Sequence, residues 1–270
     1  QIKVDYLMAR VVQHEAFVVT LHGDYKTFDE LKDDSRRILN FESKLKFITS
    51  KNPAFVYISR TQRVYIESKN LGATSLTKIY NGYPDLTVHS NKSDVFTFGM
   101  IARGIKEKGW QIAIDAFLKV HEQFPQTQLL LAGDSEYMQE LQSRYSSYPN
   151  IRFAGQVADP LAWISQLHVG LLPSYYSSES LPTSVIEYLL AGIPVLASNA
   201  GEIEQMISTP EGSAGKTFRI HQNNSDAEAL AVEMKKYLAD NHQYQQHCER
   251  AHAAFKKFDM QTCVEAYENL

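Results

Sequence analysis

Two glutamates stand eight positions apart in the sequence SESLPTSVIEYLLAGIPVLAS, residues 178–198. Glu179 precedes Pro182, which suits the first turn of a helix because its missing N–H is not needed there. We expect this helix over residues 183–191, so that Glu187 lies about one turn inside it. The free backbone N–H groups at such a helix start attract phosphate and other anions. A carboxylate close to that start can accept hydrogen bonds from neighbouring hydroxyl groups.

These residue types favour the binding of a ligand that carries both phosphates and hydroxyls. Glu187 lies four positions after Thr183, on the same helix face, where it can accept hydrogen bonds from a ribose diol. Glu179, in the loop, can fold back over the same cleft and accept from the hydroxyls of a sugar. The combination has the shape of a nucleotide sugar. The alternative is that Glu187 faces solvent and that Glu179 is an ordinary loop charge.

Short apolar runs that alternate with helical patterns must position these residues. The runs predict strands over residues 17–21, 54–58, 95–100, 128–133, 151–155, 169–173 and 194–198. Continuous apolar runs are typical of parallel strands that are covered on both faces. We therefore predict an α/β fold with a doubly wound parallel sheet, whose ligands bind at the carboxyl ends of the strands.

A linker divides the chain. Residues 81–94, NGYPDLTVHSNKSD, are rich in Asn, Gly, Pro, Asp and Ser, and a fresh strand follows them. We place the boundary near residue 88, which gives a first domain over residues 1–88 and a second over residues 89–270. The last helix, about residues 255–270, is expected to cross back to the first domain.

Composition and charge narrow the class of protein. The 270 residues carry a net charge of −4, with no basic tail and no arginines interleaved with aromatics, so we expect no nucleic-acid partner. No apolar run approaches the roughly 20 residues that span a bilayer. Cys248 and Cys263, the two cysteines, favour a reduced intracellular protein, with a single disulfide as the alternative.

The stretch with the two glutamates resembles the E-x7-E signature of retaining glycosyltransferases of the GT-B fold, the family 4 type. Four further blocks resemble the family in the same order: FGMIARGIKEKGW, LLLAGD, IRFAGQV and ASNAGEIEQMI. The resemblance covers about 120 residues, between residues 95 and 215. It implies a GT-B-like pair of Rossmann-like domains and the transfer of a sugar from a nucleoside diphosphate donor to an acceptor hydroxyl, without a metal.

The resemblance assigns the donor diphosphate to two cations that stand five positions apart, Arg103 and Lys108. Fixed cations in a closed cleft stabilise the charge that grows on the leaving diphosphate. The alternative is an exposed charge pair on a loop. Leu181 and Thr183 stand where backbone amides of the family meet the distal phosphate. Pro182 lies between them and donates nothing, so this cradle has one amide fewer than in members with the sequence EFG.

Further roles follow from the same resemblance. Glu187 resembles the glutamate that binds the ribose, and Glu179 resembles the glutamate that contacts the donor sugar. Gly99 stands where the backbone comes close to the ligand, or it forms a simple turn at a strand end. Gln156 and Val157 are expected to flank the nucleobase through backbone groups, with a core contact as the alternative for Val157.

The first domain contributes one candidate. VVTLHGDY resembles the strand that ends in a histidine facing the sugar, so we expect His22 to bind the donor sugar or phosphate near the reacting carbon. A lone histidine after a strand is otherwise structural. VYISRTQRVYIES and KIYNGYP resemble the last two strands before the hinge, which makes Asn81 and Gly82 hinge residues.

The chain departs from the family at its start. Family members begin with several more βα units and a Gly-rich loop, and about 90 such residues are absent before His22. Gln1 is not preceded by a methionine, which also indicates a trimmed chain or a fragment. We expect an incomplete N-terminal domain, an acceptor site largely outside this sequence, and a fragment that binds nucleotide yet turns over poorly.

The resemblance also implies partners and location. We expect a UDP-sugar as substrate, no cofactor and no metal, a sugar or lipid-linked acceptor in cell-envelope polysaccharide or glycolipid synthesis, and a cytoplasmic protein. Residues 36–47 either rest on the inner face of an anionic membrane or form an amphipathic helix that covers the sheet. One alternative function is a non-catalytic nucleotide-sugar-binding half that needs a partner chain. Another is a sugar epimerase, for which the acid and base carboxylates are not found.

Three other patterns carry no ligand-binding prediction. PEGSAGKT, residues 210–217, nearly spells a P-loop, but its first required glycine is a proline and no helix follows. His247, Cys248 and His252 do not stack on one helix face, so we expect a solvated surface. Ser225 and Glu228 predict a capping box for the helix that follows.

Overall fold

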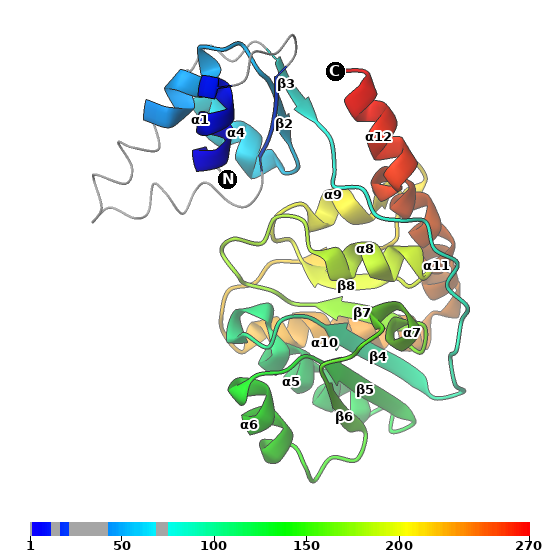
Figure 1. Ribbon diagram of the computed structural model, residues 1–270. Helices are drawn as coiled ribbons and strands as arrows, with labels where there is room; N and C mark the ends of the chain where they lie inside the picture. Colours follow the sequence, from blue (N-terminus) through cyan, green and yellow to red (C-terminus); the bar gives the residue numbers. More distant parts are fainter. Residues whose placement is uncertain (1, 12–16, 22–42, 69–74) are drawn as a thin grey trace. The chain divides into compact units, whose positions relative to one another are not determined.

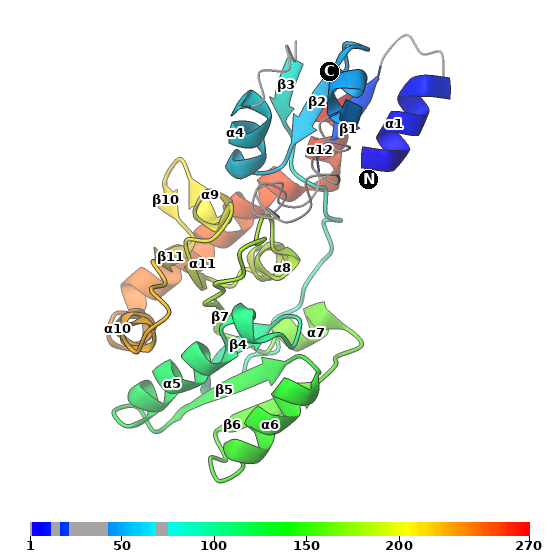
Figure 2. The ribbon, with the colours of Figure 1, turned by 90° about the vertical axis from the view of Figure 1, so that its left-hand side faces the viewer.

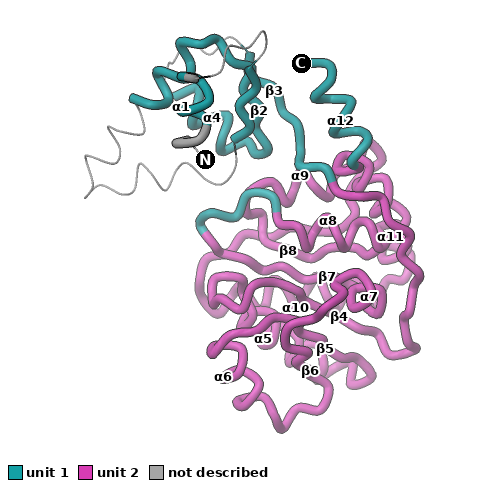
Figure 3. The backbone as a smooth tube through the Cα atoms, viewed as in Figure 1, with its two compact units in different colours: residues 1–82, 177–181, 260–270 teal, residues 83–176, 182–259 magenta. Residues whose placement is uncertain are grey.

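The computed structural model describes four stretches of the chain. These are residues 2–11, 17–21, 43–68 and 75–270. The chain divides into two compact units (Figure 3), of which unit 1 comprises residues 1–82, 177–181 and 260–270, and unit 2 comprises residues 83–176 and 182–259. The division lies between Gly82 and Tyr83, before the boundary predicted near residue 88, and the last helix belongs to unit 1.

A six-stranded, all-parallel sheet forms the centre of unit 2 (Figure 1). Its strands are β4 (Phe96–Ile101), β5 (Thr127–Ala132), β6 (Ile151–Gly155), β7 (Val169–Leu172), β8 (Val195–Ser198) and β11 (Gly215–Phe218). They lie in the order β11-β8-β7-β4-β5-β6. The chain therefore runs outward from β4 to one edge and then returns to β7, on the other side of β4. This order is that of a doubly wound sheet, so the predicted α/β fold is confirmed.

Helices cover both faces of this sheet. They are η1 (Lys106–Lys108), α5 (Trp110–His121), α6 (Glu136–Arg144), α7 (Pro160–Ile164), α8 (Thr183–Leu190), α9 (Ile203–Ile207), α10 (Ser225–Ala239), α11 (Asn241–Phe255) and η2 (Lys256–Phe258). Helix α5 packs against α10, and α11 packs against α8 and α9 (Figure 2). Helix α10 therefore shares one face of the sheet with α5, and α11 shares the other face with α8 and α9. Both faces of the apolar strands are thereby buried.

Close packing fixes the point where the sheet reverses direction. The fully buried ring of Tyr188 in α8 lies against Gly170 in β7, where an added Cβ would come within 2.4 Å of the ring. The Tyr188 hydroxyl accepts a hydrogen bond from the backbone N–H of Ile101, at 3.0 Å. One side chain thus ties β4 and β7 to the helix that carries Glu187.

Unit 1 contains a smaller parallel sheet in the described residues, with the order β1-β2-β3. Its elements are α1 (Ile2–Val11), β1 (Val18–Thr20), a helix over residues 43–49, β2 (Ala54–Tyr57), α4 (Arg60–Ser68), β3 (Ser75–Lys78) and α12 (Met260–Glu268). Phe55 and Tyr57 pack with Leu45 on one face of β2, whereas Val56 packs with Cys263 of α12 on the other. The alternation of strand side chains therefore gives this sheet two covered faces.

Several expectations of the sequence analysis are wrong. Most of VYISRTQRVYIES is helix α4 rather than a strand, because Gln62, Tyr65 and Ile66 follow helical spacing and are buried together. Ser225 does not cap α10: Asn224 is the N-cap residue, and the carboxylate of Asp226 accepts from two backbone N–H groups of the preceding loop.

The histidine cluster in α11 is not a uniformly solvated surface. His247 is only 4% exposed, and its Nδ1 lies 2.6 Å from the Tyr237 hydroxyl. Burial and nearby cations lower the pKa of His247 to about 4, so the imidazole is neutral and belongs to the packing of α11 against α10. His252 is exposed, as expected. No disulfide joins Cys248 and Cys263.

The rejected P-loop and the described residues 43–47 are parts of the packed structure. Residues 208–218 form the antiparallel pair β9 (Ser208–Thr209) and β10 (Gly212–Ser213), followed by β11, and no phosphate loop. Of residues 36–47, the structure describes residues 43–47. Leu45 is buried in the unit 1 core, and Phe47 packs against that core. Every helix in the described ranges is too short or too polar to cross a bilayer.

Filling the space at Gly170 should destabilise the fold. Gly170→Ala drives a methyl group into the Tyr188 ring, and overpacking of a closed core costs about 1–3 kcal/mol. Chemical denaturation of the variant and the parent chain measures the difference. Val232→Ala, at an exposed position of α10, is the matched control and should change stability by less than about 0.5 kcal/mol. Equal stability of Gly170→Ala and the parent would contradict this packing.

Candidate functional site

The turn after β4 carries Arg103 and is held from two directions. The indole Nε1 of Trp110 donates a hydrogen bond to the backbone carbonyl of Arg103, at 3.1 Å. The Ser135 hydroxyl, after β5, donates to the carbonyl of Gly104, at 2.6 Å. Because α5 and the end of β5 both fix this backbone, the exposed Arg103 side chain starts from a rigid point.

Lys108 ends the single turn of η1 and is only 7% exposed. The next residue, Gly109, has a φ of 87°, a conformation that side chains with a Cβ rarely adopt. An added Cβ at Gly109 would also lie 2.0 Å from the carbonyl oxygen of Pro173. The glycine therefore lets the loop after β4 press against the end of β7, which brings Lys108 to the point where the sheet reverses.

The loop after β7 supplies the ring on which the two cations meet. The backbone N–H of Tyr175 donates to the carbonyl of Glu107, at 2.8 Å, so this loop is bonded to η1. The ring of Tyr176 then lies 5.1 Å from Cζ of Arg103 and 5.4 Å from Nζ of Lys108. Two cations over one aromatic ring are attracted to it, while their own repulsion favours an anion beside them. The structure thus brings Arg103 and Lys108 together.

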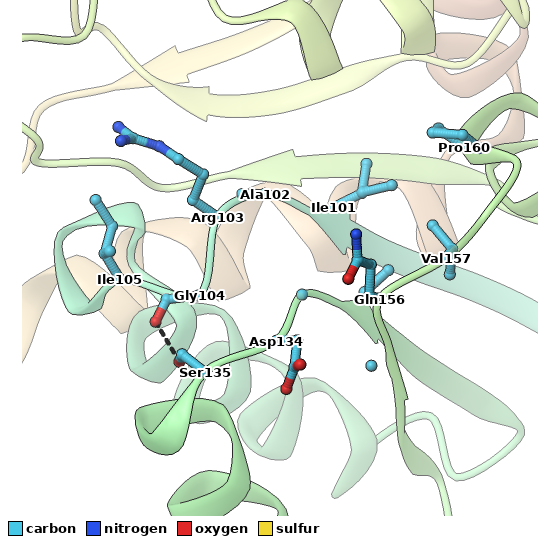
Figure 4. Close-up of a pocket in the computed structure, with 13 residues that line it drawn as sticks. Ile101, Ala102, Arg103, Gly104, Ile105, Asp134, Ser135, Gln156, Val157 and Pro160 are labelled. Atoms are coloured by element: carbon cyan, nitrogen blue, oxygen red, sulfur yellow. Dashed lines mark hydrogen bonds between the residues drawn. The ribbon is translucent and has the colours of Figure 1, made fainter.

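A pocket of about 500 Å³ opens at the carboxyl ends of β4, β5 and β6 (Figure 4). Arg103 extends from the turn after β4, Asp134 follows β5, and Gln156 and Val157 follow β6. Gln156 is exposed and Val157 is half-buried, and both line the pocket with Arg103. Three residues predicted to contact the donor therefore surround one space.

Glu187 lies half-buried on α8 and accepts a hydrogen bond from the Tyr83 hydroxyl to its Oε1, at 3.0 Å. Burial raises the pKa of Glu187 above its ordinary value, and the hydrogen bond from Tyr83 works in the opposite direction. Burial and the charge of Glu187 raise the pKa of Tyr83 to about 12, so its hydroxyl is a neutral donor. The arrangement is that of an oriented acceptor for hydroxyl groups.

The start of α8 lies beside this carboxylate along the helix. Thr183 is the first helical residue and is exposed. Pro182, which was expected in the first turn, is instead the N-cap residue, and it makes no side-chain capping bond. The first N–H groups of α8 thus have no side-chain cap, which suits the binding of an anion.

Four further predicted residues lie inside a strand, in unit 1 or outside the described residues. Gly99 lies inside β4, and an added Cβ there would meet Leu167 at 2.3 Å, so packing accounts for this glycine. Glu179, which is buried, and Leu181 belong to unit 1. His22 lies outside the described residues. Among the described residues, no group of three His, Cys, Asp or Glu side chains is arranged to hold a metal ion.

Sequence reasoning missed Tyr176, Tyr83 and Asp134. Asp134 directly follows a predicted strand and Tyr176 stands three positions after another, so their place at the carboxyl ends could have identified them. Tyr83 lies in a segment that composition marks as a linker. No local pattern links it to Glu187, which is 104 positions away.

Solved structures and curated proteins resemble this chain. The crystal structure of Anabaena Alr3699/HepE in complex with UDP and glucose matches 99% of this chain and 74% of that chain, with a TM-score of 0.74 and 19% identity. This likeness concerns the fold, which is that of GT-B glycosyltransferases. An uncharacterized glycosyltransferase of Methanocaldococcus jannaschii, MJ1059, is 29% identical over 121 residues, which are 44% of this chain and 29% of that protein.

A third relative is similar over a longer stretch. The O-antigen biosynthesis glycosyltransferase WbnH of Escherichia coli is 23% identical over 205 residues, which are 76% of this chain and 55% of that protein. The chain thus spans no more than about half the length of these two curated relatives. The family model for glycosyl transferases group 1 matches residues 92–240, which are more than half of the chain and include most of unit 2. The chain therefore belongs to the glycosyl transferases group 1 family.

Proposed function

We propose that the protein is a retaining glycosyltransferase that moves a sugar from a UDP-sugar to an acceptor hydroxyl, without a metal. One observation carries the proposal: Arg103 and Lys108 meet over the ring of Tyr176 where the sheet reverses direction. Nucleotides bind at this point in doubly wound sheets. A nucleoside diphosphate is an anion that such a pair of fixed cations recognises.

The parts of the donor fit separate parts of the site. The diphosphate lies against Arg103 and Lys108, with the N–H groups near Thr183 at its distal end. The ribose diol donates to Glu187, and the base lies along Gln156 and Val157 in the pocket. A structure of similar fold was solved with UDP and glucose, which supports a uridine donor.

The reaction follows from where charge develops. The bond between the anomeric carbon and the diphosphate oxygen breaks, and the electron pair leaves with the diphosphate. Arg103 and Lys108 stabilise that growing negative charge, and fixed cations do so without reorganisation. The acceptor hydroxyl forms the new bond on the same face of the sugar, and its proton passes to the departing diphosphate oxygen, which carries the electron pair of the broken bond. Glu179 and His22 bind the donor sugar, as the family resemblance implies.

The acceptor and a second function rest on other observations. The relative WbnH is an O-antigen biosynthesis glycosyltransferase, which supports an acceptor in cell-envelope polysaccharide or glycolipid synthesis. The second function is a nucleotide-sugar-binding half that needs a partner chain. It is favoured because Arg103, Lys108 and Glu187 all lie in unit 2. Transfer or donor hydrolysis by this chain alone excludes it.

Lys108→Ala should weaken the binding of UDP by at least about tenfold, because a charge-assisted contact to phosphate is lost. Isothermal titration calorimetry on the 270-residue chain measures the change. Lys106→Ala is the matched control: Lys106 lies two residues away in η1 and is exposed, whereas Lys108 is buried and lies over the ring of Tyr176. Unchanged UDP affinity in Lys108→Ala, or an equal loss in both variants, would contradict the proposal.

Glu187→Gln should bind UDP more weakly without losing stability. The folded state raises the pKa of Glu187 above 4.5, so ionisation of this carboxyl at pH 7 opposes folding. The amide removes that cost, and its oxygen can still accept from Tyr83. We expect a melting temperature at pH 7 equal to or above that of the parent, with a difference that shrinks as the pH falls toward 4.5. A clear loss of stability at pH 7 would show that Glu187 is there for the fold.

A further inference from the structure

We infer that Tyr83 is a positioning residue that holds Glu187 ready for the ribose and thereby sets the preference for ribose over deoxyribose. This inference rests on the proposed function, since it concerns the same donor site. The hydroxyl of Tyr83 donates to Oε1 of Glu187, at 3.0 Å. A carboxylate with one oxygen held in this way can present the other oxygen, Oε2, to ligand hydroxyls.

The backbone of Tyr83 is fixed, so its hydroxyl has a defined place. The N–H of Tyr83 donates to the carbonyl of Phe258, at 2.6 Å, and Tyr83 forms a parallel bridge with Asp259. Two residues further on, Asp85 forms an ion pair with Lys256, at 3.2 Å. Contacts with η2 and its flanking residue therefore anchor the segment that carries Tyr83.

The ring is suited to this task because it stays neutral. Burial raises the pKa of Tyr83 to about 12, and the carboxylates of Glu187 and Asp159 add to this effect. It donates a proton in the hydrogen bond at any physiological pH and does not act as an acid or base there. Tyr188, whose pKa is also raised by burial and by the charge of Glu187, is fully buried and bonded to the backbone of β4.

Glu187 needs such a partner. A half-buried carboxylate takes up a proton more readily than an exposed one. A protonated carboxyl accepts hydrogen bonds less well, and its proton competes with the donor hydroxyls of a ribose. The bond from Tyr83 favours the ionised form and also fixes the carboxylate plane. A site that is built to bind hydroxyl groups rejects analogues that lack them.

The anchoring segment also gives Tyr83 a special place in the chain. Tyr83 is the first residue of unit 2 after Gly82, and Asp259 is the last residue before α12. The residues at which the chain first enters unit 2 and last leaves it are thus bonded to each other, and one of them, Tyr83, orients Glu187. No other described side chain of this segment donates to Glu187.

The test compares UDP with 2′,3′-dideoxy-UDP by titration calorimetry on the full chain. Tyr83→Phe keeps the ring and the backbone contacts and removes only the hydroxyl. We expect its affinity for UDP to fall roughly tenfold, whereas its affinity for dideoxy-UDP stays at the parent value. Tyr148→Phe, at an exposed position, is the matched control and should leave both affinities unchanged.

Two further readouts separate positioning from a merely structural effect. In Tyr83→Phe the loss of UDP binding on acidification should begin at a higher pH than in the parent, because Glu187 has lost the donor that favours its ionised form. In a Glu187→Gln background, Tyr83→Phe should cause less additional loss than it does in the parent.

The outcomes are distinct. An equal loss for both nucleotides, or UDP affinity unchanged by Tyr83→Phe, would overturn the role of Tyr83 and leave the proposed function standing. Failure of the parent chain to bind either nucleotide would overturn the proposed function and this inference together.

Discussion

Two positive charges that share one aromatic ring are the feature on which the site in unit 2 depends. Arg103 and Lys108 lie at 5.1 Å and 5.4 Å from the ring of Tyr176, and they come from the loop after β4, whereas the ring comes from the loop after β7. Like charges repel, and the attraction of each cation to a ring is worth only about 1–2 kcal/mol. The backbone must therefore hold the pair together until an anion arrives.

The strand order and two glycines position the loops that carry the two cations and the ring. The order of the strands brings β4 and β7 side by side, although about 70 residues separate them along the chain. Gly109 permits contact with the carbonyl of Pro173, and Gly170 leaves room for the Tyr188 ring. At each glycine the absence of a side chain lets two elements come into close contact. Packing throughout the core thus offsets the electrostatic repulsion between Arg103 and Lys108.

Much of the fold of unit 2 could be predicted from the sequence, because its central strands are continuous apolar runs. The predicted strand at residues 151–155 has the observed bounds of β6, and the others differ by a residue or two. Strands β3 and β11 were not predicted, because SLTK and GKTF have too few apolar residues to show the period of a strand. The order of the strands in the sheet could not be predicted from local sequence patterns, because it depends on contacts between segments that are distant in the chain.

The site divides in the same way. Arg103, Lys108 and Glu187 could be identified from spacing, helix position and family resemblance. The partners that orient them could not be identified in this way. Tyr83 reaches Glu187 across 104 positions, and a single tyrosine within a polar linker carries no pattern. Gly99, which the resemblance predicts as a ligand contact, also has a packing partner in Leu167 that the sequence does not reveal.

A crystal structure of the 270-residue chain with bound UDP tests the central claim most directly. The account predicts the diphosphate within hydrogen-bond distance of Lys108 Nζ and the Arg103 guanidinium, next to the ring of Tyr176, with the ribose hydroxyls at Glu187. Density for UDP at any other place in unit 2, with these cations facing only solvent, would contradict it.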